Sequence, residues 1–322
     1  MVSRHSAYGD ARDDSCRVLA SPAFPKTIVT GKSCGALWQQ LICGATLGKK
    51  VFSKYVSGMS GPSASPFCII NGAPATWEKM LPVATQNYGH ITMVQMRGGM
   101  VRGLEHHLAR LKAANRELFG RTLAVKDVLE GLRAVGEARP DATVRVNVFA
   151  GEEAENVMVT AMEPIEPNWI PARFALIAYE RDMAHLKHVG SFGLSLRQRQ
   201  AVAEGYDGAV FYDRNNEISE ATIWNVGFFD GDTVVWPSAP SLRGISQIII
   251  DEGLLAAGVK VRYEPVHTGS LSRYDSAFLT NSITFGRLLS SIGEVTFDTC
   301  TDASQIIRRA YESTPFLPIP SN

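Results

Sequence analysis

A proline-rich stretch near the middle of the sequence constrains the fold more than any other feature. Pro164, Pro167 and Pro171 stand close together around Trp169. Proline at this density interrupts helices and strands and is typical of a linker. Because patterns typical of strands and helices lie on both sides of it, the sequence predicts two mixed α/β (α+β) domains.

The sequence predicts four parts of the chain. Residues 1–66 mix Ser, Gly, Asp and scattered cysteines without sustained periodicity, so we expect a poorly ordered extension. A smaller α/β domain then spans residues 67–163, a linker 164–173 and a larger domain 174–322. A length of 322 residues suits two domains of ordinary size.

Composition limits the partners of the chain. Lys plus Arg equals Asp plus Glu at 32 each, so no global field favours nucleic acid or an anionic membrane. The five cysteines are odd in number and form no CxxC pair, which argues against a disulfide framework and against a metal site. No apolar run reaches membrane-spanning length. We therefore expect a cytoplasmic protein with small-molecule ligands.

Periodicity predicts most elements of the smaller domain. Leu104, Leu108 and Leu111 share one face of a predicted helix that ends at Gly120. Asn71-Gly72 is a hairpin-turn signal. The predicted strands are 67–70, 144–150 and 156–162, and the predicted helices are 104–119 and 125–138.

The larger domain alternates strands and helices in the same way. The predicted strands lie near 174–179, 208–213, 226–229, 233–236, 259–263 and 277–280. The predicted helices lie near 191–204, 245–257 and 302–312.

Two candidate residues for chemistry follow the linker. Lys187 lies between a predicted strand and a predicted helix. To act in catalysis, its amine would need a lowered pKa, so that it is neutral. Glu220 lies in a predicted hairpin, where its carboxylate could stabilise a protonated ring nitrogen. The alternatives are a solvated lysine and an exposed carboxylate on an ordinary hairpin.

Two further segments could bind an anion. Gly244 and Ser246 open a predicted helix, whose first backbone amides are free for an anion, although a simple N-cap gives the same pattern. Arg110 lies off the apolar stripe of its helix, and by itself would be a surface arginine. The neighbouring His106 and His107 are core or surface histidines by the same reasoning.

The order of these segments resembles the class IV aminotransferases, the family of pyridoxal phosphate (PLP) enzymes with fold type IV. Branched-chain aminotransferases, D-amino acid aminotransferases and 4-amino-4-deoxychorismate lyases belong to it. The resemblance covers roughly residues 67–316. It rests on EGYDGAVFYD and ISEATIWN within 204–225, LRGIS at 242–246, HLARLKAAN at 107–115 and FLTNS at 278–282.

The resemblance implies a two-domain fold type IV chain whose larger domain binds PLP. Lys187 would form the Schiff base with the coenzyme, and Glu220 would pair with its pyridine nitrogen. Arg110 would contact the phosphate, and Leu242 would pack on the ring. Further donors to the phosphate would come from Gly244, Ile245, Ser246 and Ser282. Relatives are usually dimers, so the resemblance also implies a homodimer.

Two positions depart from the family pattern. Many relatives have a tyrosine five residues after the lysine, where this chain has Phe192. Tyr179 or Tyr206 could replace its hydroxyl. Arg243 stands where the family often has proline, so its charge could reach the phosphate or the substrate.

We therefore expect a PLP-dependent aminotransferase that moves an amino group between an amino acid or amine and a 2-keto acid. A 4-amino-4-deoxychorismate lyase is the first alternative, since the sequence Leu186-Lys187-His188 and the missing tyrosine also resemble those lyases. A non-catalytic binding protein with the same fold is the second. The sequence leaves the substrate and its L or D configuration open.

Overall fold

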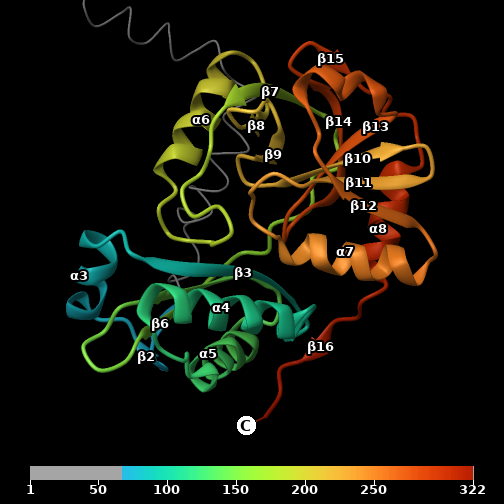
Figure 1. Ribbon diagram of the computed structural model, residues 1–322. Coiled ribbons are helices and arrows are strands. Elements are labelled where there is room, and N and C mark those ends of the chain that lie inside the picture. Colours follow the sequence, from blue (N-terminus) through green and yellow to red (C-terminus); the bar gives the residue numbers. More distant parts are fainter. Residues whose placement is uncertain (1–66, 322) are drawn as a thin grey trace, which may run out of the picture. The chain divides into compact units, whose positions relative to one another are not determined.

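The computed structural model describes residues 67–321. The extension predicted for residues 1–66 lies outside the described residues. Two β-sheets with helices against them make up the described part (Figure 1). None of its helices has the length and apolarity needed to cross a membrane.

The first sheet is antiparallel throughout, in the order β16-β4-β3-β5-β6-β1-β2. Its strands are β1 (Phe67–Ile70), β2 (Ala73–Pro74), β3 (Gly89–Arg97), β4 (Met100–Val101), β5 (Ala142–Phe149), β6 (Asn156–Met162) and β16 (Leu317–Pro318). The helices of this part are α3 (Trp77–Thr85), α4 (Leu104–Phe119) and α5 (Val125–Ala138). The β1–β2 hairpin turns at Asn71 and Gly72, both with positive φ, as the turn signal predicts.

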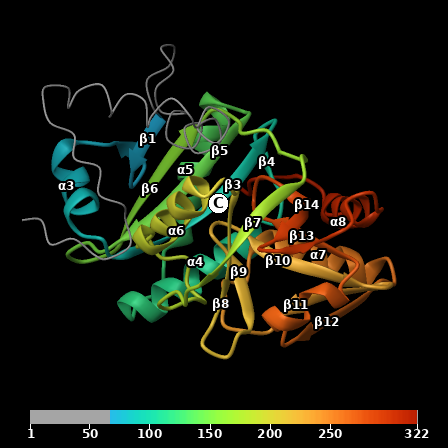
Figure 2. The same cartoon turned by 90° about the horizontal axis from the view of Figure 1, so that it is seen from above.

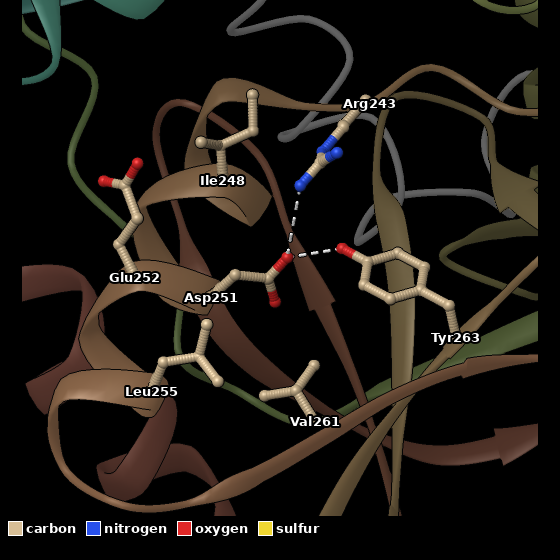
Figure 3. Close-up of a pocket in the computed structure, with 7 residues that line it drawn as sticks. All are labelled: Arg243, Ile248, Asp251, Glu252, Leu255, Val261 and Tyr263. Atoms are coloured by element: carbon tan, nitrogen blue, oxygen red, sulfur yellow. Dashed lines mark hydrogen bonds and ion pairs between the residues drawn. The ribbon is translucent and has the colours of Figure 1, made fainter.

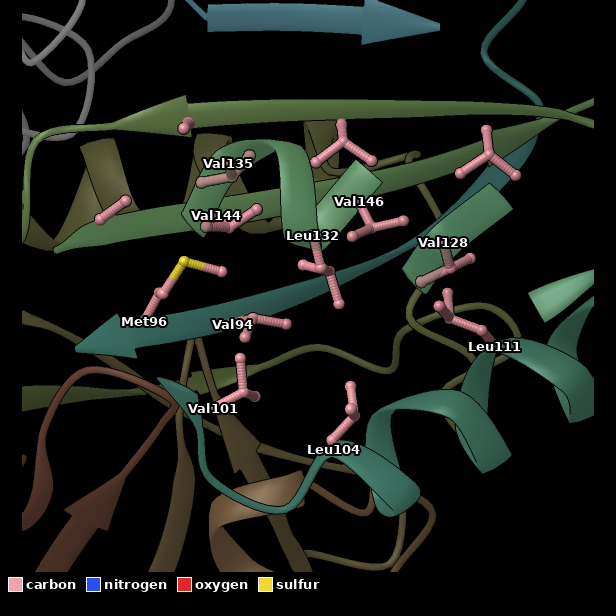
Figure 4. Packing of buried hydrophobic residues seen from close by; sticks show 14 of the residues in the cluster. Val94, Met96, Val101, Leu104, Leu111, Val128, Leu132, Val135, Val144 and Val146 are labelled. Carbon is pink, nitrogen blue, oxygen red and sulfur yellow. The ribbon is translucent and has the colours of Figure 1, made fainter. Parts of the chain in front are cut away.

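The core of this part forms where α4 and α5 cover one face of the sheet (Figure 4). Leu111 from α4, Leu132 from α5 and Val146 from β5 are fully buried in one cluster. Burial of each such side chain stabilises the fold by roughly 2 kcal/mol. The apolar faces that the 3.6-residue periods of α4 and α5 predict are therefore buried against the sheet.

The second sheet is mixed, in the order β12-β11-β10-β13-β14-β7-β8-β9, with β15 paired to β14. Its strands are β7 (Ala172–Ala178), β8 (Gly208–Tyr212), β9 (Ile218–Ala221), β10 (Asn225–Asp230), β11 (Thr233–Pro237), β12 (Lys260–Glu264), β13 (Ser276–Thr280), β14 (Phe285–Ile292) and β15 (Val295–Thr296). The helices are α6 (Phe192–Ala203), α7 (Ile245–Ala256), the 3-10 helix η1 (Thr268–Arg273) and α8 (Ala303–Glu312). Figure 2 shows the same elements from above.

Three of the longer elements were not predicted, and each breaks the simple apolar pattern. Helix α3 contains Pro82 and buries none of its side chains. Strand β3 is absent from the predicted strands, because the buried His90 and Thr92 interrupt its alternation. Strand β14 was missed because it carries the buried Arg287, which donates from Nε to the carbonyl of Ile170 at 2.7 Å.

Strand β16 connects the end of the chain to the first sheet. Leu317 and Pro318 pair with Val101 and Met100 of β4. Ile319 packs against the core of the first sheet. The predicted boundaries place the segment after α8 in the larger domain. In the structure, this segment pairs with the first sheet.

Candidate active site

The loop that carries Lys187 connects β7 to α6 and is held by strand β3. The amide of Ile91 donates to the carbonyl of Lys187 at 2.8 Å, and the amide of Val189 donates to the carbonyl of Gly89 at 3.0 Å. His90 and His188 form an antiparallel bridge between these bonds. The backbone on both sides of Lys187 is thus fixed by a strand from the other half of the chain.

The amine of Lys187 lies in an unusual electrostatic environment. The residue is partly buried, in the loop before α6. Burial, together with the positive charges of Arg110 and Arg181, lowers the pKa of Lys187 to about 7, against the opposing charge of Glu220. A neutral amine, which can attack a carbonyl, is therefore available near pH 7.

Glu220 lies on β9, and both of its oxygens are held. It is 7% exposed. Oε1 accepts from Nε of Arg181 at 2.7 Å, and Oε2 accepts from the amide of Leu242 at 3.2 Å. The alternative of an exposed hairpin carboxylate is wrong. Since a carboxylate has about four acceptor positions, it can still accept from a ring nitrogen.

Asn225 and Gly244 join the hairpin motif to the LRGIS segment. The side-chain amide of Asn225 donates to the carbonyl of Leu242 at 2.6 Å. A Cβ at Gly244 would overlap Oδ1 of Asn225, so only glycine allows this close approach. Leu242 is therefore fixed at its amide by Glu220 and at its carbonyl by Asn225.

Helix α7 begins directly after this turn, with Gly244 as its N-cap residue. The first helical bond runs from the amide of Ile248 to the carbonyl of Gly244, so the amides of the first turn, including those of Ile245 and Ser246, have no acceptor within the helix. Such amides, together with the helix dipole, could bind an anion, and this helix start is the candidate anion site.

Ser282 is brought to the same end of α7 by a hydrogen bond from Ser246. The hydroxyl of Ser246 donates to the carbonyl of Asn281 at 2.8 Å. Oδ1 of Asn281 in turn accepts from the amides of Ile283 and Thr284, both at 2.9 Å. Ser282 therefore lies at the tip of a fixed turn beside the anion site.

Arg110 is not a surface arginine. Its Nη2 donates to the hydroxyl of Thr92, and burial lowers its pKa to about 10, so it stays charged at neutral pH. Oγ1 of Thr92 also lies 2.6 Å from Nδ1 of His107. This histidine is buried, and burial lowers its pKa well below the ordinary value. Nε of Arg110 is buried and has no hydrogen-bond partner among the described residues.

These residues fit bound PLP. Lys187 could supply the amine for its aldehyde, and the first turn of α7 could supply amides for its phosphate. An anionic oxygen would satisfy the buried, unpartnered Nε of Arg110. The buried Glu220 carboxylate suits a protonated pyridine nitrogen. Hydrogen bonds link the LRGIS and FLTNS segments to the hairpin motif, and the Lys187 loop to β3.

The side chains at and near the missing tyrosine do not supply a hydroxyl to Lys187. Phe192 is 78% exposed at the start of α6. The hydroxyl of Tyr179 lies against Gly193, which has no Cβ to obstruct it. The ring of Tyr206 stacks under the guanidinium of Arg173. No described hydrogen bond joins Tyr179 or Tyr206 to Lys187.

Arg243 points to a surface groove instead of the anion site (Figure 3). Its Nη2 lies 3.9 Å from Oδ2 of Asp251, and its guanidinium lies over the ring of Tyr263. The groove has a volume of about 260 Å³ and includes neither Lys187 nor Glu220. These contacts do not involve Lys187 or Glu220, and a role of Arg243 at the phosphate or substrate stays a prediction.

Sequence reasoning missed two arginines near the amine. Arg181 contacts Glu220 directly, and Arg145 on β5 adds a further positive charge that lowers the pKa of Lys187. Neither stands in a motif that the sequence made visible. Asn225 belonged to the quoted ISEATIWN block, but its role needs the fold of the Leu242 turn.

Solved structures confirm the fold. A 4-amino-4-deoxychorismate lyase from Pseudomonas aeruginosa superposes with a TM-score of 0.64 at 21% identity, over 75% of this chain and 97% of the other. A branched-chain amino acid aminotransferase from Escherichia coli gives 0.67 at 17% identity, over 78% and 94%. The PLP-bound form of a hypothetical aminotransferase from Mycobacterium tuberculosis gives 0.68 at 15% identity, over 77% and 99%. The fold is fold type IV of the PLP-dependent aminotransferases.

The family is shown at the level of sequence. No curated protein is matched by the chain. Residues 89–292, more than half of the chain, match the family described as amino-transferase class IV, whose members depend on PLP. The chain therefore belongs to the class IV aminotransferases.

Proposed function

We propose that this protein is a PLP-dependent aminotransferase that exchanges the amino group of one substrate with the carbonyl oxygen of a 2-keto acid. The observation that carries the proposal is the environment of Lys187. The amine of this partly buried residue has a pKa of about 7 and lies near a buried carboxylate and several arginines. A solvated structural lysine would have none of these features.

In this proposal, PLP supplies an electron sink that stabilises negative charge at the substrate α-carbon. Arg110, the first-turn amides of α7 and Ser282 bind the phosphate. Glu220 holds the proton on the ring nitrogen, since its carboxylate is already oriented by two donors. Leu242 packs against the ring.

Lys187 has two tasks. Its neutral amine forms the covalent link to the coenzyme. Once a substrate amine is bound in its place, the neutral amine of Lys187 would take the proton from the substrate α-carbon and later return it as the general acid. Both tasks need an amine that is neutral near pH 7.

Arg145 gives a reason to expect an anionic substrate. It lies on β5, and its positive charge acts on the amine of Lys187. A carboxylate on the substrate would be attracted to the same region. This supports amino acids and keto acids over amines that lack a carboxylate as the substrate class.

A PLP-dependent lyase is the second candidate. It is favoured by Phe192, whose exposed side chain brings no hydroxyl to the site where many aminotransferases use a tyrosine. In a lyase, Lys187 would remove the same α-proton, and a β-elimination would follow in place of amino transfer.

One experiment separates the two functions. Purified protein with PLP is given a panel of L- and D-amino acids, each with several 2-keto acids, and the new amino acid is measured. Amino transfer that is lost in Lys187→Ala supports the proposal. Pyruvate formed from 4-amino-4-deoxychorismate without any keto acid, and no transfer across the panel, would select the lyase.

A further inference from the structure

Arg181 lies in the segment between β7 and α6, six positions before Lys187. Its side chain is 7% exposed, although the segment runs along the surface with exposed residues on both sides. A buried arginine needs partners for its donors, because an unpaired buried charge is costly.

The guanidinium donates in three directions. Nε donates to Oε1 of Glu220 at 2.7 Å. Nη1 donates to the carbonyl of Leu186 at 2.7 Å, and Nη2 donates to the carbonyl of Ala184. One acceptor is therefore the carboxylate on β9, and the other two belong to the loop that leads into Lys187.

The same loop has three further contacts on this side: Nε2 of His185 lies 2.8 Å from Oε1 of Glu117, Nε2 of His188 lies 3.0 Å from the carbonyl oxygen of Asp182, and the amide of Leu186 donates to the carbonyl of Met183 at 2.8 Å. Met183 and His185 are exposed, and Met183 adopts a left-handed conformation with φ of 47°. A non-glycine residue in that region costs free energy, which the surrounding contacts must offset. On its other side, the loop is bound by β3 through Ile91 and Val189.

We propose that Arg181 is a positioning residue that joins the Lys187 loop to the Glu220 carboxylate, so that the two groups move as one unit. This inference rests on the proposed function, in which Lys187 and Glu220 act at opposite ends of the coenzyme ring. Arg181 sets the distance between them without contacting the reacting atoms.

Only an arginine can make this connection. Its planar guanidinium presents several donors in a fixed geometry, whereas a lysine presents one nitrogen on a flexible stem. Lysine at position 181 would keep the charge beside Glu220 but could not hold both carbonyls and the carboxylate in this arrangement. The Lys187 loop should therefore be less ordered in Arg181→Lys than in the unchanged protein.

The first arm of the test uses the protein without coenzyme and measures amide hydrogen exchange at residue resolution. In Arg181→Met, the amides of Leu186 and Val189 should exchange roughly tenfold faster or more, the scale expected for loss of one or two net hydrogen bonds. Arg181→Lys should resemble the methionine variant. The amides of Asn71 and Asp275, which are bonded far from the loop, should be unchanged.

Arg214→Met is the matched control. Arg214 also pairs with a glutamate next to this segment, Glu180, at 3.2 Å, but its side chain is 81% exposed. Removal of this surface pair should leave the exchange of Leu186 and Val189 unchanged. A change as large as that of Arg181→Met would show that any nearby ion pair orders the loop and would overturn the inference.

The second arm uses the protein with PLP and records the pH at which the visible absorption band of the coenzyme shifts. A displaced loop should move this midpoint in both Arg181 variants but not in Arg214→Met. A general loss of stability would not move it.

The outcomes separate the two proposals. If PLP does not attach to Lys187 in the unchanged protein, the proposed function fails, while the exchange arm still tests the connection. If PLP attaches normally and both Arg181 variants keep slow exchange at Leu186, the connection is overturned and the proposed function stands. If Arg181→Met unfolds, Arg181→Lys decides, because full protection in that variant would also overturn the inference.

Discussion

At the scale of single residues, the candidate site depends on how burial changes the pKa of its charged groups. The amine of Lys187 loses its hydration, and Arg110 and Arg181 place positive charge near it, so its pKa lies at about 7 instead of 10.5. In the unfolded chain, the same amine is solvated and binds its proton up to its ordinary pKa. The two states therefore bind different numbers of protons above pH 7.

This difference predicts how stability depends on pH in the protein without coenzyme. Between pH 7 and 9 the unfolded state holds a proton on Lys187 that the folded state has released, so the free energy of unfolding rises with pH. Lys187→Met removes this contribution. The stability advantage of the variant over the unchanged protein should shrink by roughly 2 kcal/mol from pH 7 to 9, as measured by urea denaturation.

Lys112→Met is the control for this pH series, since Lys112 is exposed on α4. Its stability difference from the unchanged protein should stay constant over the same range. A constant difference in Lys187→Met as well would mean that the amine is solvated, and the low pKa would have to be abandoned.

Gly244 gives a second prediction at this scale. In Gly244→Ala, the new methyl group would overlap Oδ1 of Asn225, so the turn before α7 must move. Because that turn orients Leu242 and the first amides of the helix, PLP affinity should fall by about tenfold to a hundredfold, which corresponds to one or two net hydrogen bonds. Equilibrium dialysis of PLP measures this change.

The control is Gly269→Ala in η1, where a methyl group meets open space. Its affinity for PLP should equal that of the unchanged protein. Equal affinity in Gly244→Ala would show that the coenzyme does not depend on this turn.

At the scale of elements, helix α5 and strand β6 pack at a glycine. A Cβ at Gly131 would lie 2.5 Å from Cγ2 of Val159. Alanine normally favours a helix interior over glycine by up to about 1 kcal/mol. Gly131→Ala should nevertheless destabilise the protein, because Val159 lies in a filled core and has little room to move.

Gly136→Ala, in the same helix, is the matched control. Its methyl group would have neighbours at 3.5 Å and beyond, which is ordinary contact, so the variant should be as stable as the unchanged protein or more stable. Thermal unfolding of the two variants compares them directly. Similar melting temperatures would mean that α5 does not pack tightly on β6.

The same scale shows which elements the sequence could predict. Helices α4 and α5 have clear 3.6-residue patterns because one face is buried and the other is exposed. Strand β14 has buried polar side chains among apolar ones, such as Arg287 and Ser291, so its pattern carries no alternation. Tertiary contacts, which the local sequence does not encode, stabilise such a strand.

At the scale of the whole described chain, the site draws on segments that are distant in sequence. Arg110 comes from α4, Lys187 from a loop bound to β3, and Glu220 from β9. The turn at Ser282 joins them through Ser246. Spacing alone could not predict this assembly, and only the resemblance to a family indicated it.

Arg181 shows the limit of that resemblance. It contacts Glu220 and the Lys187 loop at once, yet its position stands in no quoted motif. A buried arginine in a polar surface segment has no periodicity that reveals it. The three-dimensional contacts were needed to find it.

The most direct test of the account is to locate the covalent link. Protein reconstituted with PLP is reduced with borohydride, digested and analysed by mass spectrometry. The account predicts one reduced pyridoxyl phosphate group per chain, on Lys187, and none in Lys187→Ala. An adduct on another lysine, or no adduct at all, would contradict it.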